Sequence, residues 1–217
     1  MDQVLSNSDD TQMLVAQAVD GDANALSLLM DRYRERLRRM VGLRMDRRLQ
    51  GRVDASDVVQ EALIEAARRL DEYAAKPPMG FFLWLRWLTG EKLLNAHRQH
   101  LGTQKRDAGQ EVSLYRRALP EASSVSIAHQ LLGQLTSPTQ AVYRAELQLI
   151  VQEVLNSMDP IDREVLILRN FEQLTTDETA QTLGIKRSTA SKRYITALKR
   201  LKQAMSAIPI PGINKSL

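Results

Sequence analysis

A basic stretch near the carboxyl terminus could do the most distinctive chemistry in the chain, the binding of phosphate. It reads GIKRSTASKRYITALKRLKQ, residues 184–203, and seven of these residues are lysine or arginine while none is acidic. Its apolar residues nevertheless recur at helical spacing. Like charges crowded onto one helix repel one another, so the stretch indicates a polyanionic partner that offsets the repulsion. A solvated basic face is the alternative when the charge run is taken alone.

The residues around this stretch predict the motif that presents it. Thr175 and Glu178 have the spacing of a capping box, which predicts a short helix over 176–183. Gly184 can supply a tight turn before a second helix that begins near Ser188. This order predicts a helix-turn-helix, whose second helix enters the major groove of DNA. We expect the DNA contacts of this motif to be Lys186, Arg187, Ser188, Thr189, Ser191, Lys192 and Arg193.

The basic helix should bury one face. At 100° per residue its apolar arc contains Ala190, Tyr194, Ala197, Leu198, Leu201 and Met205. Ser188, Lys192 and Lys199 fall on the opposite side. Ile195 also falls towards the polar side, where a thymine methyl or a protein partner could cover it.

An acidic stripe marks a second region, DASDVVQEALIEAARRLDEY at 54–73. The spacing predicts one helix from about Ser56 to Tyr73, with Asp54 or Ser56 as its N-cap. Val58, Leu63, Ala66 and Leu70 can pack inwards. Asp57, Gln60, Glu61 and Glu65 then share the outer face, which is either solvated or a docking surface.

The aromatic residues cluster directly after this region. Four of the chain's ten Phe, Trp and Tyr residues fall within seven positions, at Phe81, Phe82, Trp84 and Trp87. Aromatic rings can stack on unpaired bases, but they more often pack in a core. We favour the core for Phe82 and Trp84.

Composition and motifs argue against catalysis and membranes. The chain has no cysteine, no Gly-rich phosphate loop and no GxSxG or HExxH motif, so we expect no catalytic residue, metal or cofactor. No apolar run approaches the roughly 20 residues that cross a bilayer, and the acidic amino terminus does not resemble a signal peptide. Net charge is only +4, although residues 184–203 alone carry seven positive charges. The basicity is therefore concentrated in that stretch. We expect a cytoplasmic protein without membrane insertion.

Helical periodicity dominates the 217 residues, which predicts an all-α chain of two small domains joined by a flexible linker. In the first domain, Gly21-Asp22 should separate two helices, Pro77-Pro78 should force a loop, and a further helix is expected over 82–100. Residues 106–137 mix Gly, Ser, Pro and charge and are predicted to be the linker, with one short helix near 114–119. The predicted ranges are 1–105 for the first domain, 138–206 for the second and 207–217 for a disordered tail.

Both halves resemble bacterial sigma factors of the extracytoplasmic-function (ECF) group, in the sigma-70 family. The segment Asp54 to Glu61 is similar to the family's Asp-Ala-x-Asp-hydrophobic-Val-Gln-Glu helix. In the second half the similar elements are 162–166, Leu168-Arg169, Leu183-Gly184-Ile185, Thr189, Arg193, Ala197 and Leu201. The resemblance covers about 11–105 and 138–205.

The resemblance implies two further sets of site residues. The acidic helix would dock on core RNA polymerase through Asp54, Asp57, Gln60, Glu61 and Glu65. The segment 76–100 would melt the downstream promoter element, with a flipped base captured at the loop 73–81. Its implied DNA contacts are Lys76, Phe81, Arg86, Trp87, Lys92, Asn95 and Arg98. Asn95 stands where many relatives have Asp, and Glu91 where many have Asn, which affects the expected base preference.

We therefore expect a sigma factor that binds core RNA polymerase and promoter DNA, with an anti-sigma factor as a further candidate partner. One alternative is a non-sigma helix-turn-helix regulator that binds a palindromic operator as a dimer. Another is a helical adaptor, similar to an anti-sigma factor, that ignores free DNA.

Overall fold

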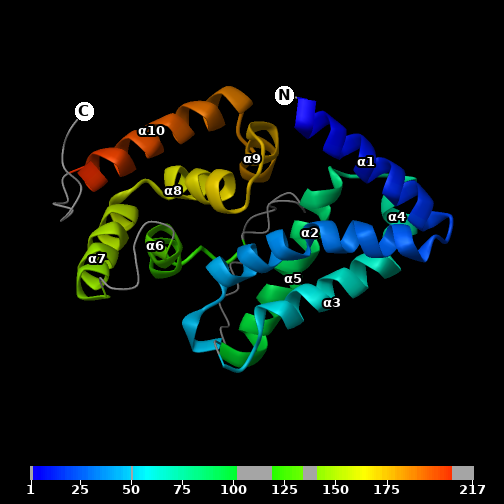
Figure 1. Ribbon diagram of the computed structural model, residues 1–217, viewed down its shortest axis with the longest axis horizontal. Coiled ribbons are helices and arrows are strands. Elements are labelled where there is room, and N and C mark those ends of the chain that lie inside the picture. Colours follow the sequence, from blue (N-terminus) through cyan, green and yellow to red (C-terminus); the bar gives the residue numbers. More distant parts are fainter. Residues whose placement is uncertain (1, 50, 102–118, 134–140, 207–217) are drawn as a thin grey trace, which may run out of the picture. The chain divides into compact units, whose positions relative to one another are not determined.

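The computed structural model describes residues 2–49, 51–101, 119–133 and 141–206 (Figure 1). Every regular element in these ranges is helical, which confirms the predicted all-α class. Contacts divide the chain into two compact units, Met1–Glu121 and Ala122–Leu217. The predicted tail and most of the predicted helix near 114–119 lie outside the described residues.

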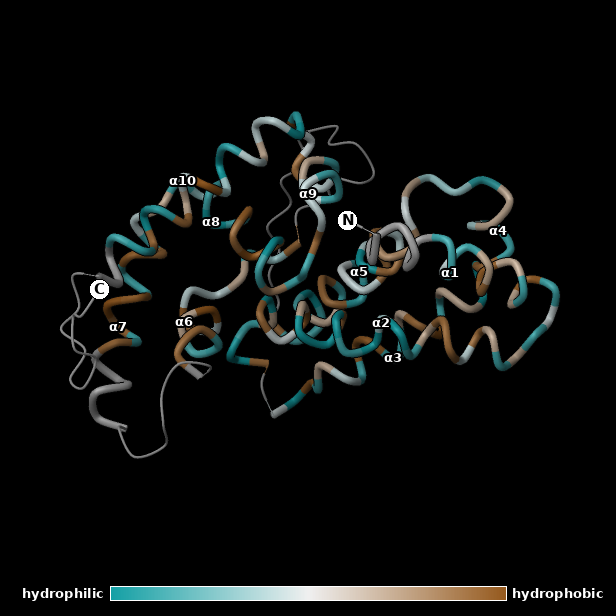
Figure 2. The backbone as a smooth tube through the Cα atoms, turned by 45° about the horizontal axis from the view of Figure 1, so that its top comes forward, coloured by the Kyte–Doolittle hydropathy of each residue, from teal (hydrophilic) through white to brown (hydrophobic). Residues whose placement is uncertain are grey.

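The first unit is a bundle in which three long helices pack against one another. Its described elements are α1 (Asp2–Val19), α2 (Ala23–Arg44), η1 (Arg47–Leu49), α3 (Ala55–Arg68), α4 (Leu70–Ala75) and α5 (Phe81–Leu101). Helices α2, α3 and α5 contact each other pairwise, and α1 packs against α2 and α4. Polar and apolar residues alternate as each helix turns (Figure 2), and the apolar faces form a core that includes Leu29, Leu37, Met40, Leu85 and Leu93.

Short-range hydrogen bonds fix where α2 and α3 begin. Gly21, at φ +95°, ends the first helix in a conformation that other residues rarely adopt. The Asp22 carboxylate then caps α2 by accepting from the amides of Asn24 (2.8 Å) and Ala25 (3.2 Å). Asp54 caps α3 in the same way, through the amide of Ser56 at 2.7 Å. The predicted interruption at Gly21-Asp22 is confirmed. Of the two candidate N-caps for α3, Asp54 and Ser56, the cap is Asp54.

The single helix predicted over 56–73 is wrong at one point, because the chain breaks it at Arg69. There φ is −108° and ψ is 12°, and the Arg69 amide is shared between the carbonyls of Glu65 and Ala66. The bend turns the following short helix inwards, so that Leu70 and Tyr73 are buried. Burial of these two side chains is the physical reason for the break, since no Gly or Pro marks it.

The second unit contains α6 (Ser124–Gly133), α7 (Ala141–Ser157), α8 (Pro160–Leu166), the π-helical turn η2 (Ile167–Phe171), α9 (Thr176–Leu183) and α10 (Arg187–Ser206). Helix α10 packs against α7, α8 and α9. The core of the unit includes Val151, Leu155, Val165, Leu168 and Ala197.

Helix α6 corrects part of the predicted linker over 106–137. It packs against α7, buries Ile127, Ala128 and Leu132, and its Ser124 hydroxyl bonds the Asn156 side chain at 2.6 Å. The neighbouring serines made this segment look like a linker, although three apolar residues in it have helical spacing. A helix this short is stable only when these residues pack against the second unit. Residues 124–133 therefore form part of the second unit.

Candidate nucleic-acid and protein interfaces

The helix-turn-helix forms as the sequence predicted. Thr175 Oγ1 accepts from the Glu178 amide at 3.1 Å, and the Glu178 carboxylate accepts from the Thr175 amide at 2.7 Å, so the capping box is complete. Gly184 ends α9 in the left-handed region, at φ 61° and ψ 36°. The Ile185 amide then bonds the Ala180 carbonyl at 3.0 Å. This turn sets the direction in which α10 leaves.

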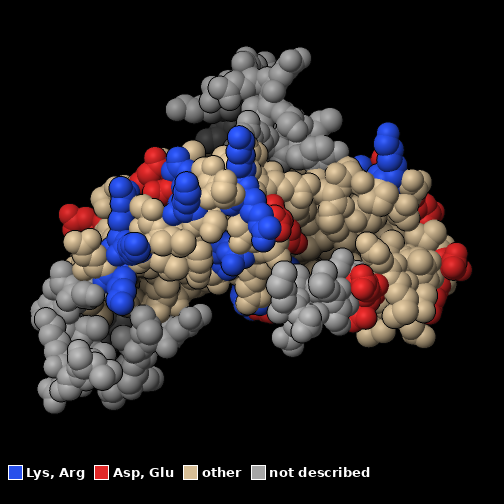
Figure 3. All heavy atoms as spheres, turned by 90° about the horizontal axis from the view of Figure 1, so that it is seen from above, with Lys and Arg blue, Asp and Glu red and all other residues tan. Residues whose placement is uncertain are grey.

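Helix α10 buries two alanines and exposes most of its cations. Ala190 and Ala197 are buried, while Ile195 is 50% exposed, as its position in the projection predicted. Five of the seven predicted DNA contacts are exposed: Lys186, Arg187, Ser188, Ser191 and Lys192. Thr189 and Arg193 are partly buried. Figure 3 shows lysine and arginine side chains gathered over this helix.

Arg187 makes an ion pair across the turn of the motif. Its Nε lies 3.2 Å from Asp177 Oδ1, and both side chains are about two-thirds or more exposed, at 72% and 68%. An ion pair so open to water is weak. Arg187 can therefore exchange Asp177 for a phosphate at small cost.

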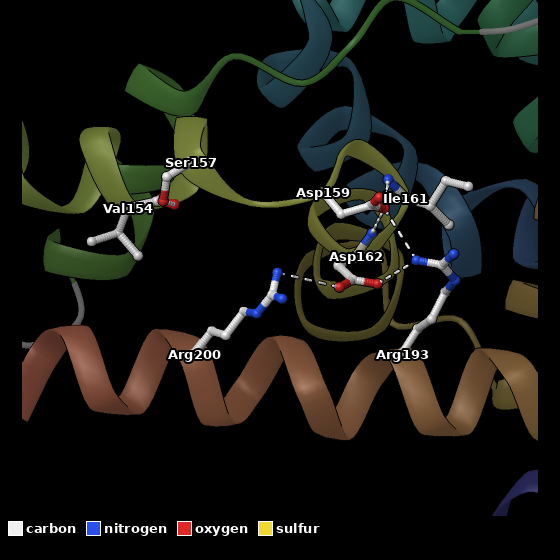
Figure 4. A network of polar contacts seen from close by, with 7 residues as sticks. All are labelled: Val154, Ser157, Asp159, Ile161, Asp162, Arg193 and Arg200. Atoms are coloured by element: carbon white, nitrogen blue, oxygen red, sulfur yellow. Dashed lines mark hydrogen bonds and ion pairs between the residues drawn. The ribbon is translucent and has the colours of Figure 1, made fainter.

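Arg193 is placed differently from the other predicted DNA contacts. Its Nη1 lies 2.7 Å from Asp162 Oδ1 and 3.1 Å from Asp159 Oδ1, which points the guanidinium towards α8 (Figure 4). Asp162 is only 5% exposed. The same carboxylate reaches Arg200 of α10, with Oδ2 at 3.8 Å from Nη1. One acidic residue of α8 thus pairs with two arginines of α10.

The second acid of this cluster also begins α8. Asp159 is the N-cap of that helix, and its carboxylate accepts from the amides of Ile161 (2.9 Å) and Asp162 (3.3 Å). The amide of Asp162 is the main cause that lowers the pKa of Asp159, with further contributions from Ile161 and Arg193. Sequence reasoning missed this cluster, although Asp159-Pro160 is a recognisable start of a helix.

The predicted polymerase-binding residues of the first unit lie on α3. Val58, Leu63 and Ala66 are buried, which confirms the amphipathic pattern. Of the polar set, Asp54 is occupied as the cap and its pKa is lowered chiefly by the Ser56 amide. Asp54, Asp57, Gln60 and Glu61 are exposed, while Glu65 is half-buried.

Two of these side chains are held by cations of neighbouring helices. Gln60 Oε1 accepts from Arg34 Nη1 of α2 at 2.8 Å. Glu65 lies 4.0 Å from Lys92 Nζ of α5. Asp57 and Glu61 of α3 also line an open groove of about 420 Å³, together with Lys92 and Asn95 of α5. The structure thus brings residues of the two predicted sets into one groove.

The aromatic cluster is a packed core. Trp84 is 3% exposed and stacks on Tyr73, with ring centroids 4.5 Å apart. Phe82 packs on Tyr33 at 5.6 Å and lies beneath the Arg36 guanidinium. The core role predicted for Phe82 and Trp84 is confirmed. Phe81 is equally buried, with its ring 5.6 Å from that of Trp84, so it does not present a face to solvent.

The remaining predicted contacts for the downstream element divide by exposure. Lys76, Asn95 and Arg98 are exposed, and the Asn95 side-chain oxygen accepts from Arg98. Lys92 and Trp87 are half-buried, with Arg69 above the Trp87 ring at 5.5 Å. Arg86 is buried in the unit, as is Phe81. The long helix α5 is thus covered along its first half and open along its second.

Within the described residues, no helix has the length and apolar character needed to cross a membrane.

A family model and several known proteins match nearly the whole chain. The family model described as ECF sigma factor matches residues 8–207. The RNA polymerase sigma-H factor of Pseudomonas aeruginosa is 25% identical over 91% of this chain and 94% of its own. The ECF RNA polymerase sigma factor SigD of Mycobacterium tuberculosis is 27% identical over 89% and 83%. The ECF RNA polymerase sigma-E factor of Escherichia coli is 26% identical over 86% and 89%.

A solved structure shares the fold. The chain is similar to a chain in the solved structure titled "Structure of CnrH in complex with the cytosolic domain of CnrY". The TM-score is 0.51 and the identity 21%, and the match covers 91% of this chain and 98% of the solved chain. The family whose model matches acts with RNA polymerase in promoter-specific initiation of transcription and is not catalytic. A match of this extent, over both units, establishes the assignment: the chain belongs to the ECF sigma factor family.

Proposed function

We propose that the second unit reads the upstream promoter element as a duplex, with α10 in the major groove. The observation that best supports this role is the exposed, acid-free start of α10, held by the capped helix α9 and the Gly184 turn. Lys186, Arg187 and the amides at the start of α10 would hold phosphates. Ser188, Ser191 and Lys192 would reach base edges, because they occupy the exposed side.

We propose that the first unit docks on the polymerase and melts the downstream element. Asp57 and Glu61 are exposed carboxylates one helical turn apart on α3, and they suit a basic surface. Lys76, Asn95 and Arg98 are available to DNA on the loop 76–80 and on the open half of α5. Phe81 and Arg86 would support this surface from inside, since both are buried.

The division of labour needs no strong DNA binding by either unit alone. Once α3 is bound to the polymerase, both DNA contacts become effectively intramolecular, which raises their apparent affinity. We also propose an action in the cytoplasm and a regulatory protein partner. The second proposal is supported by the relative whose structure was solved with the cytosolic domain of CnrY.

A titration against bacterial core RNA polymerase, followed by run-off transcription from a random promoter library, tests the proposed function. We expect tight binding to the core enzyme and enrichment of a two-part motif. Failure to bind the core enzyme, together with specific binding to a palindromic duplex, would instead support a dimeric regulator.

Lys192→Ala tests the recognition surface. We expect it to weaken binding of the holoenzyme to the selected upstream element by about 1–3 kcal/mol if a base contact is lost. Discrimination at the base pair that Lys192 reads should also relax, because a base contact carries sequence information. Lys192→Arg is the matched control, since it keeps a cation that can donate hydrogen bonds to a base edge. Unchanged binding by Lys192→Ala would exclude this residue from the interface.

A further inference from the structure

We infer that Arg193 is a positioning residue that fixes the recognition helix on α8, and that it is not a DNA contact. This inference rests on the proposed function, in which α10 reads the upstream element. The sequence placed Arg193 among the DNA contacts because of its charge and its position in α10. The structure gives its guanidinium two carboxylate partners inside the unit, Asp159 and Asp162.

The contact holds the helix at two points. Asp162 uses Oδ1 for Arg193 at 2.7 Å and Oδ2 for Arg200 at 3.8 Å. These arginines are seven residues apart, so they lie on one face of α10 about 10 Å from each other along its axis. Figure 4 shows both reaching the same side chain. The short Arg193 contact supplies most of the hold, and the longer ion pair with Arg200 adds a second point that opposes rotation and sliding of the helix.

The acids are themselves fixed in place. Asp159 is tied to the first turn of α8 by two amide hydrogen bonds, and Asp162 belongs to that same turn. The Asp162 side chain is 7% exposed. If Arg193 moved to a phosphate, this carboxylate would lose its closest cation while remaining buried, which is costly. Arg193 therefore stays on α8 when DNA binds.

The consequence for recognition is geometric. Successive residues of a helix are 100° apart, so fixing Arg193 against α8 also fixes the direction of Ser188 and Lys192 on the outer side. If the contact is lost, α10 can turn or tilt, and the same side chains meet the bases at the wrong angle. Non-specific attraction to phosphate depends much less on that angle.

Asp162→Asn in the full chain, bound to core RNA polymerase, separates the two roles. If Arg193 were a DNA contact, removing its competing carboxylate would free it and tighten promoter binding. If Arg193 positions the helix, specific binding should fall about 10-fold while non-specific binding to a scrambled duplex stays unchanged. A variant that merely folds less would lower both in proportion, so the ratio of specific to non-specific binding is the decisive readout.

Arg193→Gln and the double variant Arg193→Gln, Asp162→Asn complete the test. We expect the double variant to lose no more specificity than either single variant. Arg193→Gln should leave the salt slope unchanged, unlike the loss of a phosphate contact. Tighter binding by Asp162→Asn, or a slope reduced by one in Arg193→Gln, would overturn the positioning role. A wild-type holoenzyme without any specific binding would instead refute the proposed function, whatever the variants do.

Discussion

The double substitution Asp57→Arg, Glu61→Arg is expected to weaken binding to core RNA polymerase by about 100-fold or more, because two attractive contacts become like-charge contacts. Both side chains are exposed on α3, away from the buried face that carries Val58 and Leu63. The substitution should therefore leave the bundle intact. Fluorescence anisotropy of the labelled chain titrated with core enzyme measures the loss.

Asp71→Arg is the matched control for this prediction. Asp71 is an exposed acid in the first turn of α4, as Asp57 is in the first turn of α3. Asp71 lies outside the predicted docking set. We expect near wild-type binding to the core enzyme from this control. Equal losses in both variants, or a double variant that binds normally, would contradict the assignment of α3 as the docking helix.

Trp84→Ala is expected to lower the free energy of unfolding of the first unit by about 3–5 kcal/mol, as large-to-small changes of buried aromatic residues do. The ring of Trp84 stacks on Tyr73 and contacts Phe81, so its removal opens a cavity beside these two aromatic side chains. Urea unfolding monitored by the fluorescence of Trp87 gives the measurement.

Ile64→Ala provides the comparison, because Ile64 lies on α3 and is 44% exposed. A surface change of this kind should stay within about 0.5 kcal/mol of wild type. If Trp84→Ala kept its stability but lost promoter opening, the ring would be a base-stacking group, and the core assignment would be wrong.

The features that sequence reasoning predicted well are local ones. The capping box at Thr175, the left-handed turn at Gly184 and the cap at Asp54 each depend on residues within three or four positions of one another. Their chemistry can be recognised without knowledge of the rest of the chain. The all-α class follows from the same short-range periodicity.

The features that were missed depend on distant partners. Arg193 finds its carboxylates 31 and 34 residues earlier in the chain, so its charge and its position in α10 suggested a DNA contact. The helix break at Arg69 and the burial of Phe81 depend on how α4 and α5 pack. The spacing of apolar residues along the sequence gives no information about that packing. Tertiary packing decided each of these cases.

The placement of the acids that hold Arg193 also defines what can be exchanged between relatives. In a host whose preceding helix has no carboxylates at the matching positions, a chimaera that receives only residues 175–203 would leave Arg193 without its partners. Its recognition helix would then read DNA at an altered angle, even though every base-contacting side chain had been transferred. On the proposed role of Arg193, the smallest portable recognition module of this protein would therefore begin at Asp159, the first residue that anchors the helix.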